Sequence, residues 1–306
     1  MHGRESMTNF LEGFKVGHYT DEANRTGCTV VLPPSGNVAS CDVRGSSPSS
    51  RELTLLDLER RLTEVHAVLL TGGSAFGLAA ADGVVAWLAE RDIGYDTPVA
   101  RVPIVPAAVV FDLGSGNPDA RPGPKEGRLA CETASSSAIA TGPVGAGTGA
   151  TVGKWGGFEF AERGGLGIGR AEAEGMSVAA IAVVNAVGDV IDPDGHSIAG
   201  SSLEGGWVRA PRRPDAEDTA PVNTVLALVA TYAHLDKREV KWLAERGSDG
   251  VTTSVRPAHT RYDGDVCFAI AAPPAAGAAE TNLDVLGVLA TQAVANAVRD
   301  SVRSSP

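Results

Sequence analysis

The sequence predicts a fold that mixes buried strands with helices. Short apolar runs of strand length recur between turn-forming segments, as at Val65 to Leu70, Val178 to Val184 and Val225 to Ala230. Helical periodicity marks other stretches, notably Leu78 to Glu90 and Thr281 to Val302. The chain has 306 residues, of which 43% are hydrophobic, so it can bury a core in one large domain or in two.

Composition argues against nucleic-acid and membrane partners. The net charge is −11, the isoelectric point is about 5.0, and no basic stripe is visible. No apolar stretch reaches the length of a membrane span, and the first residues contain no apolar segment of signal-peptide length.

The cysteines predict a reducing compartment. Cys28, Cys41, Cys131 and Cys267 are scattered and form neither a C-x-x-C pair nor a zinc spacing. We expect buried free thiols and a cytoplasmic protein. No cluster with metal-ligand spacing stands out, so neither a metal nor a cofactor is expected.

Further elements are predicted along the chain. Residues 26–44 are predicted as a hairpin, with Cys28 to Leu32 and Val38 to Val43 as its strands. Residues 192–223, rich in Gly, Ser, Pro and charge, are expected to form an exposed linker. We also expect partial helix in 51–64, strands at 103–113 and 266–271, and helices at 126–140 and 237–246.

A glycine-rich turn follows the strand that ends at Leu70. The pattern Thr71-Gly72-Gly73-Ser74-Ala75-Phe76-Gly77 approaches the G-x-S-x-G nucleophile elbow, but Phe76 occupies the last glycine position. We therefore expect a tight strand-to-helix turn in which Gly72, Gly73 and Ser74 line a pocket through their backbone amides.

A second glycine run, residues 142–153, leads to Lys154. A P-loop would need a glycine where Thr148 stands and a hydroxyl residue where Trp155 stands. Gly145-x-Gly147-x-x-Ala150 fits a loose dinucleotide fingerprint, although it follows a predicted helix instead of a strand. A nucleotide-binding domain that uses this run stays open as an alternative.

The junction between Asn223 and Thr224 is a candidate site of self-cleavage. A polar, proline-bearing stretch changes there into the buried strand that begins with Thr224. Cleavage would give Thr224 a free α-amine, whose pKa of about 7.7–8.0 lets it act as a base near neutral pH. A loop that simply ends in a strand is the competing interpretation.

Three more polar residues stand at strand ends. Asn185 follows the strand at 178–184, where it can form a turn or present its amide to a site. Asp263 and Asp265 flank a glycine just before the strand at 266–271. They can form a simple turn, bind a metal, or hold an ammonium and a hydroxyl in position.

Together these stretches resemble the L-aminopeptidase/D-esterase family of N-terminal-nucleophile hydrolases, which includes β-aminopeptidases and the nylon-oligomer hydrolase. The resemblance extends from about Gly17 to the final helix. It is carried by TGGSAFGL at 71–78, the run that ends in Gly153-Lys154, VNAVG at 184–188, VNTVL at 222–226 and PAHTRYDGD at 257–265.

The resemblance implies an α+β fold, a four-layer αββα sandwich, as one hydrolase domain over residues 1–306. It implies self-cleavage between Asn223 and Thr224 into an α fragment, 1–223, and a β fragment, 224–306. It also implies a homo-oligomer, a tetramer or larger, that acts on small-molecule amide or peptide substrates, including nylon-type oligomers.

The family's site residues carry over one by one. Thr224 corresponds to the nucleophile, whose freed amine is the base, and Asn185 corresponds to the donor for the oxyanion. Lys154 corresponds to the lysine that tunes the proton balance of the nucleophile. Asp263 and Asp265 correspond to the carboxylates that orient the amine and the hydroxyl of Thr224.

One departure concerns the substrate pocket. Several relatives carry a tyrosine where this chain has Phe111, so any hydrogen bond of that hydroxyl is absent. The other alternative, an acyltransferase of the ornithine-acetyltransferase type, should show an Ala-Thr-Met-Leu-like cleavage stretch. The chain instead has Val222-Asn223-Thr224-Val225.

Overall fold

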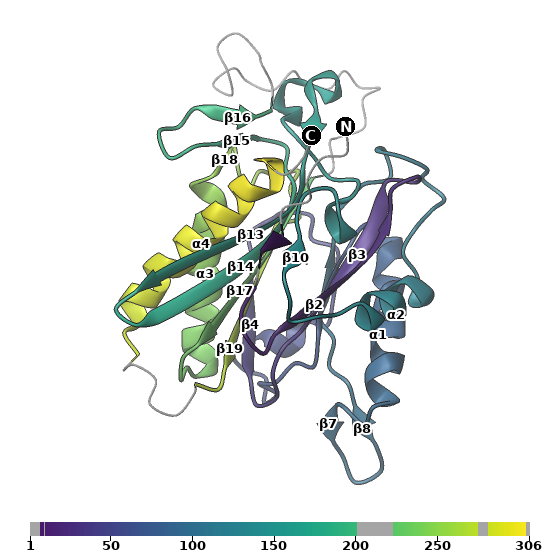
Figure 1. The fold of residues 1–306 in the computed structure, drawn as a ribbon, viewed down its shortest axis with the longest axis vertical. Coiled ribbons are helices and arrows are strands. Elements are labelled where there is room, and N and C mark those ends of the chain that lie inside the picture. The colour runs from purple at the N-terminus through teal and green to yellow at the C-terminus, as the bar shows by residue number, and fades with distance from the viewer. Residues whose placement is uncertain (1–6, 9, 201–222, 275–280, 304–306) are drawn as a thin grey trace.

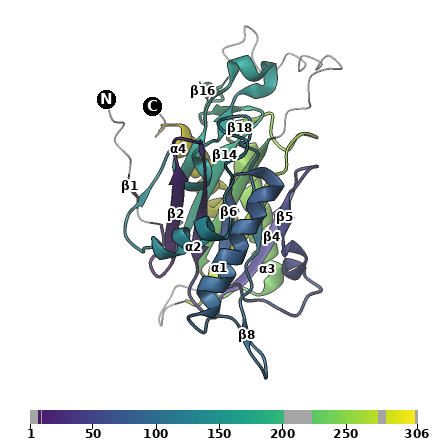
Figure 2. The ribbon, with the colours of Figure 1, turned by 90° about the vertical axis from the view of Figure 1, so that its right-hand side faces the viewer.

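The computed structural model describes residues 7–8, 10–200, 223–274 and 281–303. Two five-stranded sheets face each other, and a pair of helices covers the outer face of each (Figure 1, Figure 2). The expected α+β fold with four αββα layers is therefore confirmed. The predicted linker falls partly on residues 201–222, which lie outside the described residues.

The first sheet has the strand order β13-β14-β17-β19-β4. Neighbouring strands are antiparallel, except that β17 and β19 run parallel. Helices α3 and α4 pack on its outer face. The bounds are β13 Gly165–Ala173, β14 Met176–Asn185, β17 Thr224–Tyr232, β19 Val266–Ala272, β4 Val38–Val43, α3 Lys237–Thr252 and α4 Leu283–Arg303.

The second sheet has the strand order β2-β3-β6-β9-β5, and α1 and α2 cover its outer face. Only β6 and β9 are parallel in it. The bounds are β2 Lys15–Asp21, β3 Thr26–Leu32, β6 Val68–Thr71, β9 Ala107–Val109, β5 Ser50–Arg51, α1 Ala80–Ala89 and α2 Pro124–Glu132.

Short elements connect these layers. Three two-stranded pairs are β1 Met7–Thr8 with β10 Ile139–Ala140, β11 Thr151–Val152 with β12 Glu162–Arg163, and β7 Tyr95–Asp96 with β8 Arg101–Val102. A three-stranded sheet joins β16 Ser197–Ala199, β15 Asp189–Ile191 and β18 Val255–Arg256. The 3₁₀ turns are η1 Leu53–Leu56, η2 Ser74–Ala79, η3 Gly145–Gly147, η4 Lys154–Gly156 and η5 Phe158–Phe160.

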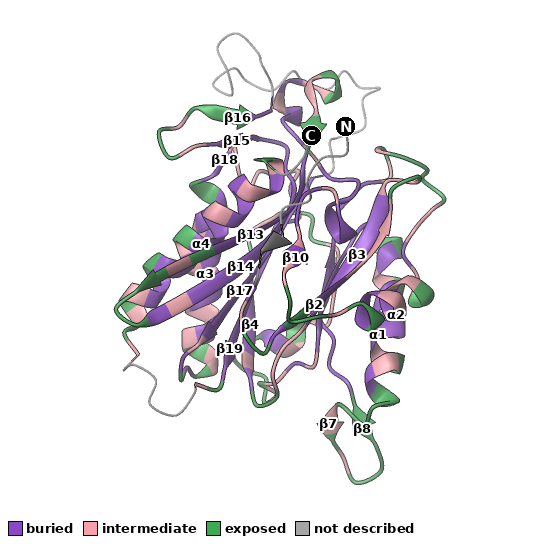
Figure 3. Ribbon diagram, in the orientation of Figure 1, coloured by how far each residue is buried: buried purple, intermediate pink, exposed green. Residues whose placement is uncertain are grey.

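The buried hydrophobic side chains form three clusters, one between each two neighbouring layers of the sandwich. Strand β17 contributes to two of these clusters, because its side chains point alternately to the two faces of the sheet. Val225, Ala227 and Val229 pack against α3 and α4, while Leu226 and Leu228 pack between the sheets. Burial on both faces makes the central strands continuously apolar, and Figure 3 shows them as the buried centre of the molecule.

The predicted hairpin at 26–44 is wrong. Both strands exist, but β3 pairs with β2 and β6, whereas β4 pairs with β19 in the other sheet. Residues 33–37 carry the chain from one sheet to the other, and the amide of Asn37 fastens this crossing to the backbone of Val65. Six consecutive buried residues in β3 need cover on both faces, which a hairpin exposed on one face cannot supply.

The helix predicted at 126–140 is shorter than expected. Helix α2 ends at Glu132, and Ser135 pairs instead with Val16 of β2. The hydroxyl of Ser135 accepts a hydrogen bond from the amide of Ser137, a local bond that competes with helix. In 51–64, only η1 is helical. The strands and helices predicted at 178–184, 225–230, 237–246, 266–271 and 281–302 are present with shifts at their ends.

Strand β13 was missed because glycine is a poor strand former. Its Gly165, Gly167 and Gly169 face the backbone of α4. A Cβ atom at Gly167 would lie 2.0 Å from the carbonyl oxygen of Ala297, and one at Gly169 would lie 2.0 Å from that of Ala293. The glycines therefore let the helix backbone rest directly on the strand.

This contact gives a stability test. We expect Gly167→Ala to lower the free energy of unfolding by about 1–3 kcal/mol, because the added methyl meets backbone atoms that cannot turn aside. Gly114→Ala is the matched control, since nothing lies within 4 Å of its Cβ position. Thermal unfolding of both variants checks this, and equal melting temperatures would contradict it.

Candidate active site

The site lies at one end of the first sheet, where three strand ends meet. Because β17 and β19 are parallel, their first residues lie side by side, with Leu226 opposite Val266. This brings the segment before β19 next to Thr224. Strand β14 is antiparallel to β17, so its last residue, Asn185, lies opposite Thr224.

Thr224 contacts the carbonyl group of the residue before it. Its side chain is buried, and Oγ1 donates to the carbonyl oxygen of Asn223 at 2.5 Å. The backbone N–H of Gly264 donates to the same oxygen at 2.9 Å. Gly264 approaches so closely that a Cβ there would lie 3.1 Å from Oγ1 of Thr224 and 2.6 Å from the carbonyl oxygen of Ser47. Two donors thus polarise the carbonyl of Asn223.

The two aspartates flank this glycine and have different partners. Asp265 Oδ1 accepts from the backbone N–H of Val225 at 2.6 Å, and its Oδ2 lies 2.7 Å from Nδ1 of His259. Asp263 Oδ2 accepts from the N–H and the hydroxyl of Thr260 at 2.7 and 2.6 Å. Burial, with the nearby charge of Asp265, raises the pKa of Asp263 to about 6.

Lys154 and Asn185 form one polar cluster. The ammonium of Lys154 donates to Oδ1 of Asn185 and to Oγ1 of Thr151, both at 3.0 Å, and to the backbone oxygen of Asn185 at 3.3 Å. Burial lowers the pKa of Lys154 to about 7, although the charge of Asp263 opposes the shift. A sizeable share of this lysine is therefore the neutral amine at neutral pH.

The amide group of Asn185 is oriented by its partners. Its Oδ1 accepts from Lys154 and from the backbone N–H of Thr151, so Nδ2 faces the carbonyl oxygen of Phe111 at 3.0 Å. An amide nitrogen has two N–H donors, so this bond uses one of them. In the intact chain the carbonyl of Asn223 is held by Gly264 and not by Asn185.

The five predicted catalytic residues thus lie together, while the predicted pocket residues lie one step away. The carbonyl of Phe111 contacts Asn185, and the carboxylate of the next residue, Asp112, accepts from the N–H of Gly73 at 2.7 Å. The amides of Gly72 and Ser74 donate to the carbonyls of Gly27 and Val110. These three amides are therefore hydrogen-bonded within the chain and are not available as donors to a ligand.

The glycine run at 142–153 does not form a phosphate loop. Gly145, Ala146 and Gly147 are buried against the second sheet, and their N–H groups donate to Thr20 Oγ1, Thr29 Oγ1 and the carbonyl of Val144. A phosphate loop needs such amides free. These N–H groups are therefore not available to bind a phosphate, which argues against the nucleotide-binding alternative.

Sequence reasoning missed the roles of His259, Gly264, Thr260 and Thr151. The first three lie in the stretch 257–265, so their nearness to Asp263 and Asp265 was visible. Their partners were not, because these depend on the parallel pairing of β17 with β19. All four cysteines are buried free thiols, as expected.

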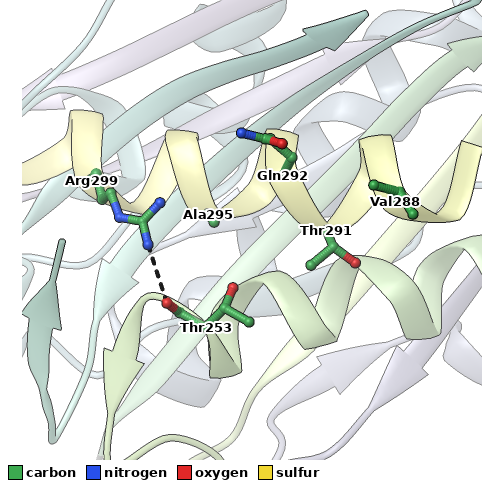
Figure 4. Close-up of a pocket in the computed structure, with 6 residues that line it drawn as sticks. All are labelled: Thr253, Val288, Thr291, Gln292, Ala295 and Arg299. Carbon is green, nitrogen blue, oxygen red and sulfur yellow. Dashed lines mark hydrogen bonds between the residues drawn. The ribbon is translucent and has the colours of Figure 1, made fainter. Parts of the chain in front are cut away.

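Two other features lie apart from this cluster. A surface cavity of about 300 Å³ lies between α3 and α4, where Arg299 donates to the carbonyl oxygen of Thr253 (Figure 4). Among the described residues, one group has spacing suited to a metal ion: Asp192, Asp194 and His196, at the β15–β16 turn. None of these residues contacts Thr224. No helix in the described part of the chain is long and apolar enough to cross a membrane.

Sequence comparisons find relatives named as an aminopeptidase and as an oligomer hydrolase. An uncharacterized aminopeptidase of Mycobacterium tuberculosis (strain ATCC 25618 / H37Rv) is 39% identical over 94% of this chain and 90% of its own length. A 6-aminohexanoate-oligomer endohydrolase of Kocuria sp. (strain KY2) is 28% identical over 98% of this chain and 87% of its own.

Solved structures share the fold. A β-aminopeptidase of Burkholderia sp. superposes with a TM-score of 0.72 at 20% identity, over 100% of this chain and 89% of its own. An L-aminopeptidase D-Ala-esterase/amidase from Ochrobactrum anthropi, described as a variant of the Ntn hydrolase fold, gives 0.70 at 19% identity, over 100% and 88%.

Fold and relatives together define a hydrolase of the amidohydrolase/peptidase class. Residues 8–305 match peptidase family S58, and the chain belongs to that family.

The lowered pKa of Lys154 can be measured directly. The chain has only five lysines, so the ¹³Cε resonances of labelled protein can be followed through a pH titration. We expect one resonance to titrate near pH 7, because burial disfavours the ammonium. This resonance should be missing in Lys154→Met and present in Lys125→Met. A Lys154 resonance that titrates near pH 10 would contradict the result.

Proposed function

We propose that this chain is a self-processing amidohydrolase in which Thr224 becomes an N-terminal nucleophile. Cleavage between Asn223 and Thr224 divides it into fragments 1–223 and 224–306. The observation that carries the proposal is the contact of the Thr224 hydroxyl with the carbonyl of Asn223, together with the N–H of Gly264 on the same oxygen.

The cleavage reaction needs only groups of the chain itself and one water molecule. Oγ1 of Thr224 adds to the carbonyl carbon of Asn223 as its hydroxyl proton leaves, and the N–H of Gly264 stabilises the charge on the oxygen. The C–N bond then breaks, and the nitrogen takes a proton to become the free amine. Water hydrolyses the resulting ester, which leaves a carboxylate on Asn223 and restores the hydroxyl of Thr224.

The side chain of Asn223 favours this step. Within the described structure, both polar atoms of its amide are buried and have no hydrogen-bond partner. An unpaired buried polar group costs about 1–3 kcal/mol. This cost destabilises the intact chain and is relieved when the new end at Asn223 leaves the site.

Hydrolysis of a substrate repeats the same chemistry. The freed α-amine of Thr224 takes the hydroxyl proton as Oγ1 attacks the amide, then gives it to the leaving amine. Asp263 and Asp265 hold the amine and the hydroxyl, and Lys154 tunes the proton balance. The second N–H of Asn185 supplies a donor for the oxyanion.

The substrate class follows from the relatives and the chemistry. The family is a peptidase family, and the relatives are named as an aminopeptidase and a 6-aminohexanoate-oligomer endohydrolase. We therefore propose peptides, amino-acid amides or ω-amino-acid oligomers as substrates. We propose Phe111 as part of the substrate pocket, since its backbone carbonyl contacts Asn185. The cleaved units are expected to assemble as a homo-oligomer, a tetramer or larger.

Mutation of Thr224 tests whether its hydroxyl is needed for self-cleavage and for substrate hydrolysis. Thr224→Ala should stay whole and lose at least about 10³-fold in amide hydrolysis, because the only attacking oxygen is gone. Thr224→Ser should retain processing, since the acyl shift needs the oxygen and not the methyl group. Intact mass spectrometry over a time course, with N-terminal sequencing, checks for a chain that begins at Thr224.

Ser74→Ala is the matched control. It removes a hydroxyl from the other candidate nucleophile, so processing and activity should match the wild type. Wild-type activity in Thr224→Ala, with loss of activity in Ser74→Ala, would overturn the proposal.

A further inference from the structure

His259 contacts two acceptors that fix its protonation. Its Nδ1 lies 2.7 Å from Oδ2 of Asp265, and its Nε2 lies 3.2 Å from the carbonyl oxygen of Ser248 on α3. A carbonyl oxygen can only accept, so Nε2 carries a proton. When the Asp265 carboxyl is ionised, its oxygen also only accepts, so Nδ1 then carries a proton as well. The ring is therefore an imidazolium bound to a carboxylate.

This ion pair sits beside the nucleophile. The other oxygen of Asp265 accepts from the N–H of Val225, the residue after Thr224. Asp265 thus joins the first peptide of β17 to His259, and His259 joins it to the backbone of α3. Both side chains are largely buried, at 14% and 4% exposure, so solvent screens the pair little.

The backbone of His259 is held in an uncommon conformation. Its φ is 52°, in the left-handed region that residues other than glycine seldom adopt. This turn aims the ring back at Asp265, six residues later in the chain. Such a conformation persists only where the surrounding contacts impose it.

We propose that His259 is a positioning residue for the nucleophile. As an imidazolium fixed between Ser248 and Asp265, it holds the carboxylate against the Thr224–Val225 peptide and balances its charge. The oriented carboxylate is then ready to bind the ammonium that cleavage creates on Thr224. The catalytic part of this inference rests on the proposed function, whereas the ion pair itself does not.

The surrounding charges give the direction of a pH effect. Asp265 and Asp263 attract the imidazolium, and Arg44 repels it. Burial alone would lower the pKa of His259, but the hydrogen bond and charge of Asp265 outweigh it and raise the pKa above its usual value. In turn, the cation lowers the pKa of Asp263. Loss of the cation should therefore raise the pKa of Asp263 and move the acidic limb of the rate profile to higher pH.

Nitrogen-15 NMR tests the ion pair without any need for activity. In Thr224→Ala chains labelled on histidine, we expect one imidazole with both ring nitrogens protonated at pH 7. It should disappear in His259→Gln and become neutral in Asp265→Asn. A neutral ring at His259 in the parent chain would overturn the inference.

Kinetics of processed enzyme test the catalytic role. For His259→Gln we expect kcat to fall about 10–100-fold, as for other hydrogen-bond partners of catalytic groups, with KM changed less than about threefold. The acidic limb of the kcat/KM profile should shift to higher pH by about one unit. His259→Asn should behave alike, and it offers a second variant because asparagine adopts the left-handed conformation readily.

The matched control is His66→Gln. His66 is also partly buried, and its Nδ1 accepts from the backbone of Ile104, but it lies outside the site. Its variant should keep the wild-type pH profile. A fall in kcat in His259→Gln with an unmoved acidic limb would indicate a merely structural role and overturn the inference. An unprocessed, inactive wild type would instead refute the proposed function, and the NMR result would still decide the ion pair.

Discussion

The parallel pairing of β17 with β19 is the constraint on which the rest of the site depends. It sets two strand beginnings side by side, so that the Asp263–Asp265 turn closes over Thr224. That register brings the N–H of Gly264 to the carbonyl of Asn223 and the carboxylate of Asp265 to the N–H of Val225. A parallel pair also needs a long crossover, and α3 supplies it while covering the sheet.

Burial then sets the proton balance of the cluster. It raises the pKa of Asp263 to about 6 and lowers that of Lys154 to about 7, so both groups lie near the point where they change charge. Small changes in the surroundings of these two groups would therefore change the charge of the site near neutral pH. The imidazolium of His259 adds a positive charge on the far side of Asp265, which keeps the group of charges close to balance.

The sequence predicted which residues lie together at the site, but not how they contact one another. Thr224, Asn185 and the aspartates each stood at a strand end, and five ordered motifs pointed to the family. The partners of these residues could not be predicted, because they depend on which strands pair. The hairpin at 26–44 failed for the same reason, since local turn residues do not show that two strands join different sheets. Strand β13 was hidden because its glycines serve the backbone of α4, not the sheet.

The strand order of the first sheet has a consequence for the cleaved molecule. Cleavage before Thr224 would place β17 and β19 in one fragment, and these strands lie between β14 and β4 of the other. The two parts would therefore share the first sheet and the cores on both of its faces, whereas the core under α1 and α2 belongs to residues 1–223 alone. Cleavage between Asn223 and Thr224 would therefore leave the two parts held together by the backbone pairing of one sheet.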